Sequence, residues 1–399
     1  MRIAFAGTAA TLEVPGSPEF EVALKAAAPG WSFAASQARG DPQAIVTEEA
    51  GGFSLAVRSN NPIHTTAVGA ACGAIVALAN AWVDERPDQL CFHGGAALLD
   101  GQLIVFPNRY RAGKSTLIAR LASMGLTIFG DDILPVSADD DAGVAFGLAP
   151  RLRIPLPEAA SQTFRNFVEE HSAASDGRYC YLRLGAGLLA ARGATAPLGA
   201  VVLLDRVEHG RPELLHASRS AALQALIERN FARAAPSGAL LNRLHSLMDR
   251  LPRVTLRYSN FEDAAELLAA TFASWPPHIP TTDEFRVEVS PLAGPDIVGG
   301  TKLAQSFAPE TLLIRNTAVT LHQVEDSLFL ATPDGLSIHR LNATGAGLWT
   351  LLAEPISQDQ SIEVLCDAFP DAEPRAVADD VSRLFAALLR EGLIIEAGR

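Results

Sequence analysis

The segment 107–116, PNRYRAGKST, ends in a glycine, a lysine and two hydroxyl residues just before the apolar run LIARLASM. A loop of this kind binds phosphate through its backbone N–H groups, while the lysine contacts the β and γ phosphates and the Ser/Thr hydroxyl holds Mg²⁺. The usual pattern has a glycine five residues before Gly113, where this chain has Asn108. Asparagine tolerates a positive φ better than most residues. The alternative is an ordinary capped helix after a buried strand.

The predicted phosphate contacts come from this loop and the first turn of the helix after it. They are Asn108, Arg109, Arg111, Ala112, Gly113, Lys114, Ser115 and Thr116. The chain has only three lysines among its 32 Lys and Arg residues, so a lysine at this position is notable. A compact ammonium group fits between two phosphates, a role that arginine fills poorly. ATP and Mg²⁺ are the expected cofactors.

Two adjacent acids, Asp131 and Asp132, follow a predicted helix over 115–124 and a short strand over 126–130. The helix covers about 15 Å and the strand returns about 16 Å. We therefore expect both carboxylates at the same sheet edge as Lys114, where a Mg²⁺–nucleotide site needs them. Ser115 and Asp132 are the predicted metal ligands. Acids exposed to solvent at a strand end are the alternative.

The stretch FHGGAALLDGQLIVFPNRYRAGKSTLIARLASMGLTIFGDDILPV resembles the core of HPr kinase/phosphorylase, whose fold is shared with phosphoenolpyruvate carboxykinase. The shared order is a His-Gly pair, a hairpin, a loop ending GKS, one helix, a glycine and an Asp-Asp pair. The resemblance implies that His93, Asp131 and Asp132 surround the reacting phosphate beside Lys114, with one aspartate as the base. It is specific over about 45 residues and loose from there to residue 275. A structural histidine near a turn is the alternative for His93.

The chain departs from that family where the later Glu-x-Arg-Gly signature is expected. The nearest stretch, YLRLG, has Tyr181 in place of the acid and Arg183 as the arginine. The reverse, phosphorylase reaction is therefore not expected, and the chain resembles more closely the related kinases found beside peptide-modification genes. Arg151 and Arg153 are further candidates for phosphate or acceptor contacts, with a plain surface role as the alternative.

Alternating strand and helix patterns over 1–275 predict an α/β or α+β kinase domain. A Pro- and Gly-rich linker is expected over 276–315, with one added strand at FRVEV. Three strands and three helices over 316–399 predict a small winged-helix-like domain. That segment carries 13 acids against five arginines and no lysine, and the whole chain has a net charge of −13. Binding to nucleic acid is disfavoured, because phosphate would repel such a surface.

The same segment resembles the PqqD-like family of recognition elements that bind leader peptides of ribosomally made, modified peptides. HRLNATGAGLWTLL (339–352) and VADDVSRLFAALLREGLI (377–394) carry this resemblance. It implies that an extended leader adds to the third strand beside the third helix. The predicted leader contacts are Ser337, His339, Arg383 and Arg390. In the alternative, both helices form only a packed core.

Composition also indicates where the protein is located and which partners it has. No apolar run reaches the length of a membrane span, and 67–83 is expected to be a buried helix. The four cysteines form no C-x-x-C pair, so neither a disulfide framework nor a zinc site is expected. A reducing cytoplasm is the expected location. No membrane partner is expected, and the sequence does not decide between a monomer and a homo-oligomer.

The two resemblances together predict an ATP-dependent kinase that phosphorylates a Ser or Thr hydroxyl of a ribosomally made precursor peptide. The C-terminal domain would capture the leader and raise the local concentration of the acceptor. Three alternatives stay open at this point: a serine kinase of an HPr-like carrier protein, a kinase of a small metabolite, and a non-catalytic, ATP-gated peptide adaptor.

Overall fold

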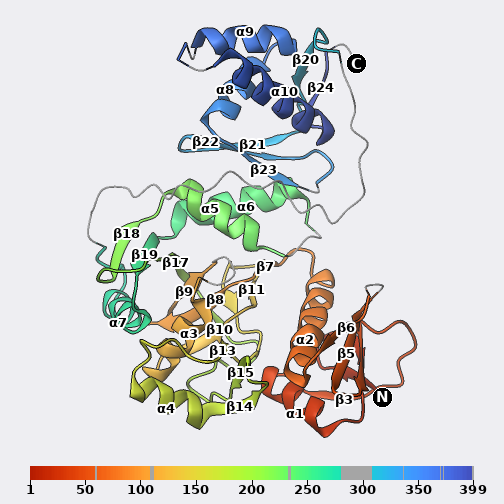
Figure 1. The fold of residues 1–399 in the computed structure, drawn as a ribbon, viewed down its shortest axis with the longest axis vertical. Helices are drawn as coiled ribbons and strands as arrows, with labels where there is room; N and C mark the ends of the chain where they lie inside the picture. Colours follow the sequence, from red (N-terminus) through yellow and green to blue (C-terminus); the bar gives the residue numbers. More distant parts are fainter. Residues whose placement is uncertain are drawn as a thin grey trace. The chain divides into compact units, whose positions relative to one another are not determined.

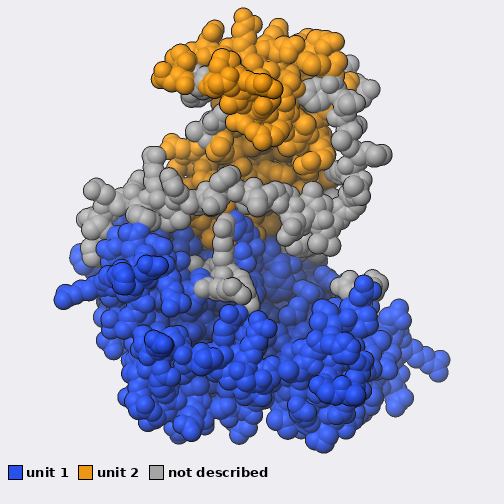
Figure 2. All heavy atoms as spheres, in the orientation of Figure 1, with its two compact units in different colours: residues 1–217, 228–234, 250–285 blue, residues 218–227, 235–249, 286–399 orange. Residues whose placement is uncertain are grey.

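The computed structural model describes residues 1–58, 61–107, 112–231, 235–279, 308–335, 337–368, 370–371 and 373–397. The chain divides into two compact units (Figure 2). Unit 1 contains 1–217, 228–234 and 250–285, and unit 2 contains 218–227, 235–249 and 286–399. Each unit has its own hydrophobic core.

This division differs from the one expected from the sequence. Most of α5 (Arg219–Arg229) and α6 (Ser237–Arg250) group with the C-terminal segment, although the sequence places both helices in the first domain. The expected linker also contains a strand, β20 (Leu313–Arg315), which pairs antiparallel with β24 (Ile394–Glu396). Three residues are too short for a pattern to show, so this pairing was not predictable. The expected strand at 285–289 lies outside the described residues.

Unit 1 begins with a six-stranded sheet in the order β3-β1-β2-β4-β5-β6. Its elements are β1 (Arg2–Phe5), β2 (Thr11–Glu13), α1 (Pro18–Ala27), β3 (Phe33–Ala35), β4 (Ala44–Glu49), β5 (Gly52–Val57), β6 (Ile63–Thr65) and α2 (Ala67–Asp84). Helix α2 is long and apolar enough to cross a membrane by composition, yet most of it is buried in the core of this sheet. The expected buried helix is confirmed.

A second six-stranded sheet, in the order β10-β8-β9-β17-β19-β18, forms the centre of unit 1 (Figure 1). Its strands are β8 (Gly95–Leu99), β9 (Gln102–Phe106), β10 (Thr127–Gly130), β17 (Leu198–Arg206), β18 (Glu213–His216) and β19 (Arg253–Tyr258). The expected hairpin joins β8 to β9, and its Asp100 and Gly101 both have positive φ. β9 pairs parallel with β17, which pairs parallel with β19. The candidate loop therefore leaves the carboxyl end of a central strand.

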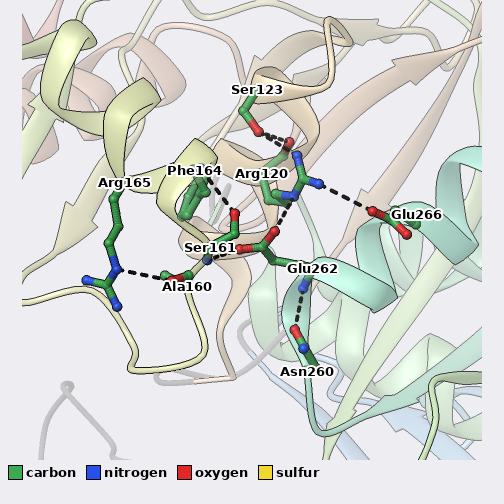
Figure 3. Close-up of polar contacts among 9 residues, drawn as sticks. All are labelled: Arg120, Ser123, Ala160, Ser161, Phe164, Arg165, Asn260, Glu262 and Glu266. Atoms are coloured by element: carbon green, nitrogen blue, oxygen red, sulfur yellow. Dashed lines mark hydrogen bonds and ion pairs between the residues drawn. The ribbon is translucent and has the colours of Figure 1, made fainter.

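Helix α3 (Lys114–Ser123) follows that loop and packs with α4 (Gln162–His171) and α7 (Phe261–Thr271) on one core. Polar contacts fix the far end of α3 (Figure 3). The Arg120 guanidinium lies 3.4 Å from carboxylate oxygens of both Glu262 and Glu266 on α7. Glu262 also accepts the backbone N–H of Ser161, the residue that caps α4. One carboxylate on α7 thus contacts both α3 and the cap of α4 and helps to hold α3 in place.

Two small sheets complete unit 1. One has the order β16-β12-β11-β7, with β7 (Leu90–Phe92), β11 (Leu134–Val136), β12 (Gly143–Val144) and β16 (Thr195–Ala196). The other has the order β13-β15-β14, with β13 (Arg151–Arg153), β14 (Ser172–Ser175) and β15 (Tyr179–Leu182).

Unit 2 contains the expected three strands followed by three helices, which confirms that part of the fold. The strands β21 (Thr320–Val324), β22 (Ser327–Ala331) and β23 (Ile338–Leu341) form an antiparallel meander. The helices α8 (Ala343–Leu351), α9 (Gln358–Ala368) and α10 (Pro374–Arg390) share a core with Leu328 and Leu330. Helix α5 is tied to the same meander, because the Glu325 carboxylate accepts the backbone N–H groups of Arg219 and Ser220.

Candidate functional site

Lys114 lies at the start of α3 with its ammonium group directed at the two acids. Gly113 caps the helix with φ +87°, a conformation that favours glycine. The Nζ atom donates to the backbone carbonyl of Asp131 and lies 3.0 Å from Oδ1 of Asp132. Lys114 is only 8% exposed, so this ion pair is largely shielded from solvent. The expectation that lysine and acids meet at one edge is confirmed.

The turn after β10 sets the direction of Asp131 and Asp132. β10 pairs antiparallel with β8 at the edge of the sheet, and the register shifts between Ile128 and Gly130. Such bulges re-aim the residues that follow them. A Cβ at Gly130 would lie 2.6 Å from the carbonyl oxygen of Ile133, so the turn closes too tightly for a side chain there. The glycine before the acid pair is thus required by the turn that presents the pair.

Gly95, the second glycine of the His-Gly-Gly stretch, gives α3 room to approach the sheet. A Cβ built there would lie 2.8 Å from Cγ1 of Ile118 and 3.2 Å from Cγ of Lys114. Any side chain would therefore push against the aliphatic part of the lysine. In the sequence this glycine was only part of a motif. In the structure its missing side chain leaves room for the aliphatic part of Lys114.

Asp131 is buried, with 2% of its surface exposed. Its Oδ2 accepts the backbone N–H of Arg151 at 3.2 Å, and the Ser115 hydroxyl also bonds to the carboxylate. Its Oδ1 is buried and has no hydrogen-bond partner among the described residues. Burial, reinforced by the negative charge of Asp132, raises the pKa of Asp131 to about 6. This carboxylate is therefore poised to take up a proton near neutral pH.

The pKa of Asp132 is shifted in the opposite direction. Burial alone would raise its pKa, but the positive charge of Lys114, then that of His93, and a hydrogen bond from Lys114 lower it. His93 Nε2 lies 3.9 Å from Oδ1 of Asp132. Burial and the nearby Lys114 lower the pKa of His93, so the imidazole is held neutral at pH 7. Adjacent acids whose pKa values are pushed apart are suited to separate tasks.

The donor set fits a metal that arrives with a nucleotide. No group of three or more His, Cys, Asp or Glu side chains that could hold a metal occurs in the described part of the chain. Mg²⁺ commonly takes only one or two carboxylates, together with substrate phosphates and water. The Asp132 carboxylate and the Ser115 hydroxyl, on the first turn of α3, offer such an incomplete oxygen set. The predicted contacts Asn108, Arg109 and Arg111 lie outside the described residues.

Tyr258 is a site residue that the sequence did not indicate. It ends β19, two strands away from β9, and is 1% exposed. Its hydroxyl donates to the carbonyl of Ala112 at 2.9 Å and would lie 2.5 Å from a Cβ at Gly113. The tyrosine therefore fixes the last residues of the loop against the sheet. No motif connects positions so far apart; only the parallel order of β9, β17 and β19 brings them together.

The three arginines predicted to contact phosphate or the acceptor, Arg151, Arg153 and Arg183, lie in different surroundings. Arg151 joins the site, since its backbone N–H binds Asp131 and its positive charge acts on Asp132. Arg153 is exposed and donates to the Tyr179 hydroxyl at 3.3 Å. Arg183 is exposed too, and the contact seen for it is a backbone N–H bond to His171. Among the described contacts of these arginines, those with the acid pair come from Arg151.

Tyr181 occupies the position where an acid was expected. It is 5% exposed and hydrogen-bonds to Cys72, and Arg151 lies close to both. Burial raises the pKa of this phenol well above its usual range, so the side chain stays neutral. A neutral phenol at this position cannot replace the charge of a carboxylate.

In unit 2, the predicted leader residues lie on β23, just before it and on α10. His339 and Arg390 approach the same carboxylate, Glu391, at 3.9 Å and 3.0 Å. The backbone carbonyl of Ser337 accepts the N–H of Thr332, and the backbone N–H of Ser337 donates to Oγ1 of Thr332. Arg383 instead pairs with Asp380 on the exposed side of α10. Within the part of the chain that the structure describes, β23 pairs only with β22, which leaves its other edge open to strand addition.

One family model and several solved structures are similar to parts of this chain. Residues 328–394 match the family model described as Coenzyme PQQ synthesis protein D (PqqD). The solved structure of TbiB1 in complex with the TbiA(beta) leader peptide matches 22% of this chain and 96% of its own, at 21% identity and a TM-score of 0.19. The Hpr(Ser) kinase/phosphatase from Coxiella burnetii matches 45% of this chain and 93% of its own, at 12% identity and a TM-score of 0.25. No curated protein matches the chain.

Proposed function

We propose that this chain is an ATP-dependent kinase that phosphorylates a Ser or Thr hydroxyl of a ribosomally made precursor peptide. The observation that carries the proposal is the contact of Lys114 with the acid pair, at the end of a strand–loop–helix unit, in a chain with a PqqD-like segment. The reaction would take place in the cytoplasm, where ATP and newly made precursor are both present.

The residues divide the work of phosphoryl transfer. Lys114, at the helix N-terminus, is placed to bind phosphate oxygens, and Asp132 together with the Ser115 hydroxyl would hold the metal. Bound Mg-ATP would supply the phosphoryl group and leave as Mg-ADP. Asp131 would orient the acceptor hydroxyl and receive its proton, a role that its raised pKa favours. His93, whose Nε2 lies 3.9 Å from Oδ1 of Asp132, would assist beside the acid pair.

Asp131 is assigned as the base because the two carboxylates differ in charge state. Asp132 pairs with Lys114 and is held ionised, which suits a metal ligand. Asp131 faces a backbone N–H and a hydroxyl and has one oxygen unbonded, which suits an acceptor hydroxyl. The sequence left open which of the two acts as base.

The PqqD-like segment would supply the specificity. An extended leader would add to the open edge of β23 by backbone hydrogen bonds, with His339 and Arg390 nearby. Because both units belong to one chain, leader capture would raise the concentration of the acceptor segment near Asp131. The acidic surface of this segment argues against a nucleic-acid ligand.

The test is mass spectrometry of a neighbouring precursor peptide incubated with the full chain and Mg-ATP. We expect a gain of about 80 Da per phosphate. Lys114→Ala and Asp131→Asn should abolish it, and removal of the leader from the peptide should strongly reduce it. Lys25→Ala is a matched control, since Lys25 is exposed on α1 and pairs with Glu21.

Other outcomes would favour the alternatives. Phosphorylation of a folded carrier protein or a small metabolite, but not of the peptide, would replace the acceptor class while keeping the chemistry. Tight binding of both peptide and ATP without any mass gain would replace the kinase with an ATP-gated adaptor.

A further inference from the structure

A cavity of about 410 Å³ opens in unit 1 on the Arg151 side of the acid pair. Three structures form its wall: the β4–β5 turn, the junction of β6 with α2, and the small sheet β13-β15-β14. Its lining residues are Ala50, Gly51, Gly52, His64, Thr65, Thr66, Gly69, Arg151, Asp176, Arg178 and Tyr179. Among the described contacts, Thr66 Oγ1 donates to Asp176 at 2.6 Å and joins two of these structures.

Three guanidinium groups gather around one ring at this cavity. The Cζ atoms of Arg151, Arg153 and Arg178 lie 4.5, 5.7 and 5.4 Å from the centroid of Tyr179. The ring attracts each cation, whereas like charges gathered around one ring repel one another. Such a cluster is unusual in a chain with a net charge of −13. An anion bound by Arg151 and Arg178, the two that line the cavity, would relieve part of this repulsion.

The acidic groups near the cavity are already engaged. Asp176 accepts from Thr66 Oγ1 and from the backbone N–H groups of Arg178 and Tyr179. Glu49 lies 3.2 Å from Nδ1 of His64. Asp176 also lines the cavity, but its carboxylate is occupied by these hydrogen bonds and is outnumbered there by Arg151 and Arg178. The cavity therefore presents positive charge to a ligand.

Arg151 connects this cavity to the reacting groups. Its guanidinium lies over Tyr179, while its backbone N–H binds Oδ2 of Asp131 at 3.2 Å. A ligand group held by the Arg151 guanidinium would thus lie about one arginine side chain away from Asp131, the candidate base. On a peptide, that separation suits a residue close in sequence to the one that presents its hydroxyl to Asp131.

We propose that this cavity binds a carboxylate of the acceptor peptide, close in sequence to the phosphorylated hydroxyl, through Arg151 and Arg178. The inference rests on the proposed kinase function and names the substrate feature that the site selects. A planar carboxylate matches the fork of N–H donors on a guanidinium. The carboxylate can come from an Asp or Glu side chain or from the end of the chain, and the test separates these sources.

The experiment uses the full chain, Mg-ATP and seven-residue peptides with one central serine, blocked at both ends. One glutamate is moved through each flanking position, with glutamine in the matched peptides. A further pair ends one residue after the serine, with a free or an amidated carboxyl terminus. Each source of carboxylate thus has its own neutral partner.

We expect at least one carboxylate peptide to have a KM about tenfold below that of its neutral partner, with similar kcat. Arg178→Gln should remove that difference, and Arg211→Gln, at another exposed arginine of unit 1, should retain it. Equal KM values for charged and neutral peptides throughout would overturn the proposal.

A binding measurement keeps this result separate from the kinase proposal. Saturation-transfer NMR of the same peptides reports contact with the protein whether or not phosphate is transferred. Carboxylate-dependent contact that Arg178→Gln abolishes would support the cavity even without turnover. Phosphorylation or contact that depends on neither the carboxylate nor Arg178 would contradict the assignment of the cavity. It would not contradict the kinase proposal.

Discussion

The two candidate binding regions of this chain are built in opposite ways. In unit 1, Lys114 and Asp131 are 8% and 2% exposed, and their partners surround them on several sides. In unit 2, the Arg383 side chain is 76% exposed and pairs with Asp380, which is 66% exposed. Between them, these regions contain the groups proposed for chemistry and for recognition.

The difference follows from what each region must do. Phosphoryl transfer needs charges held in place before the substrate arrives, in surroundings that water does not screen. An extended peptide instead gains affinity from backbone hydrogen bonds along a strand edge, and exposed side chains add smaller, adjustable contributions. Substitutions at the buried site should therefore cost far more than substitutions on α10.

The largest effect should come from Asp131. Asp131→Asn removes the proposed base, and we expect kcat to fall by about 10²- to 10⁴-fold with nucleotide affinity retained. In the wild type, kcat/KM should rise with pH through about 6, because the carboxylate must lose its proton before it can accept one. Initial rates from pH 5 to 8 measure this. A flat profile would remove Asp131 from the role of base.

The same pKa shift makes an independent prediction about stability. A carboxylate whose pKa is raised on folding favours the native state only while it is protonated, so its stabilising effect is lost as pH rises through about 6. At pH 8, the buried charge of Asp131 should destabilise the free protein. Asp131→Asn should therefore melt a few degrees higher than the wild type at pH 8, with a smaller difference at pH 5. Thermal unfolding at the two pH values tests the sign.

A smaller but still large loss should follow from Gly95→Ala. The added Cβ would press on Ile118 and on the stem of Lys114, which shifts the ammonium group away from Asp132. We expect nucleotide affinity to fall by about tenfold or more, the cost of losing one charge-assisted contact. Gly185→Ala is the matched control, because a Cβ there meets nothing within 4 Å. If both variants bind nucleotide equally, Gly95 does not position the lysine.

Much of the buried site was predictable because its parts follow one another closely along the chain. Lys114 and Asp131 are separated by one helix and one strand, whose lengths alone bring the two residues back to the same edge. The hairpin at Asp100 and Gly101 and the three strands and helices of unit 2 were readable for the same reason: each is a local pattern.

What could not be predicted depends on strand order and on contacts between distant segments. Tyr258 reaches Ala112 because β17 lies between β9 and β19, an order that no local pattern specifies. The attachment of α5 to unit 2 depends on Glu325, more than a hundred residues away. The cavity beside Tyr179 likewise combines three distant segments, so the sequence indicated Arg151 but neither Arg178 nor the space between them.

The smallest effect should come from Arg383→Gln on α10. The exposed pair with Asp380 contributes little to stability, so the melting temperature should stay within about a degree of the wild type. If Arg383 contacts an acidic leader, the variant should weaken leader binding about two- to fivefold, an effect that salt also reduces. Fluorescence anisotropy of a labelled leader at low and high salt measures this, with Arg375→Gln on the same helix as the control. A loss of a hundredfold or more would show that recognition in unit 2 is as preorganised as the site in unit 1, and the contrast between the two regions would fail.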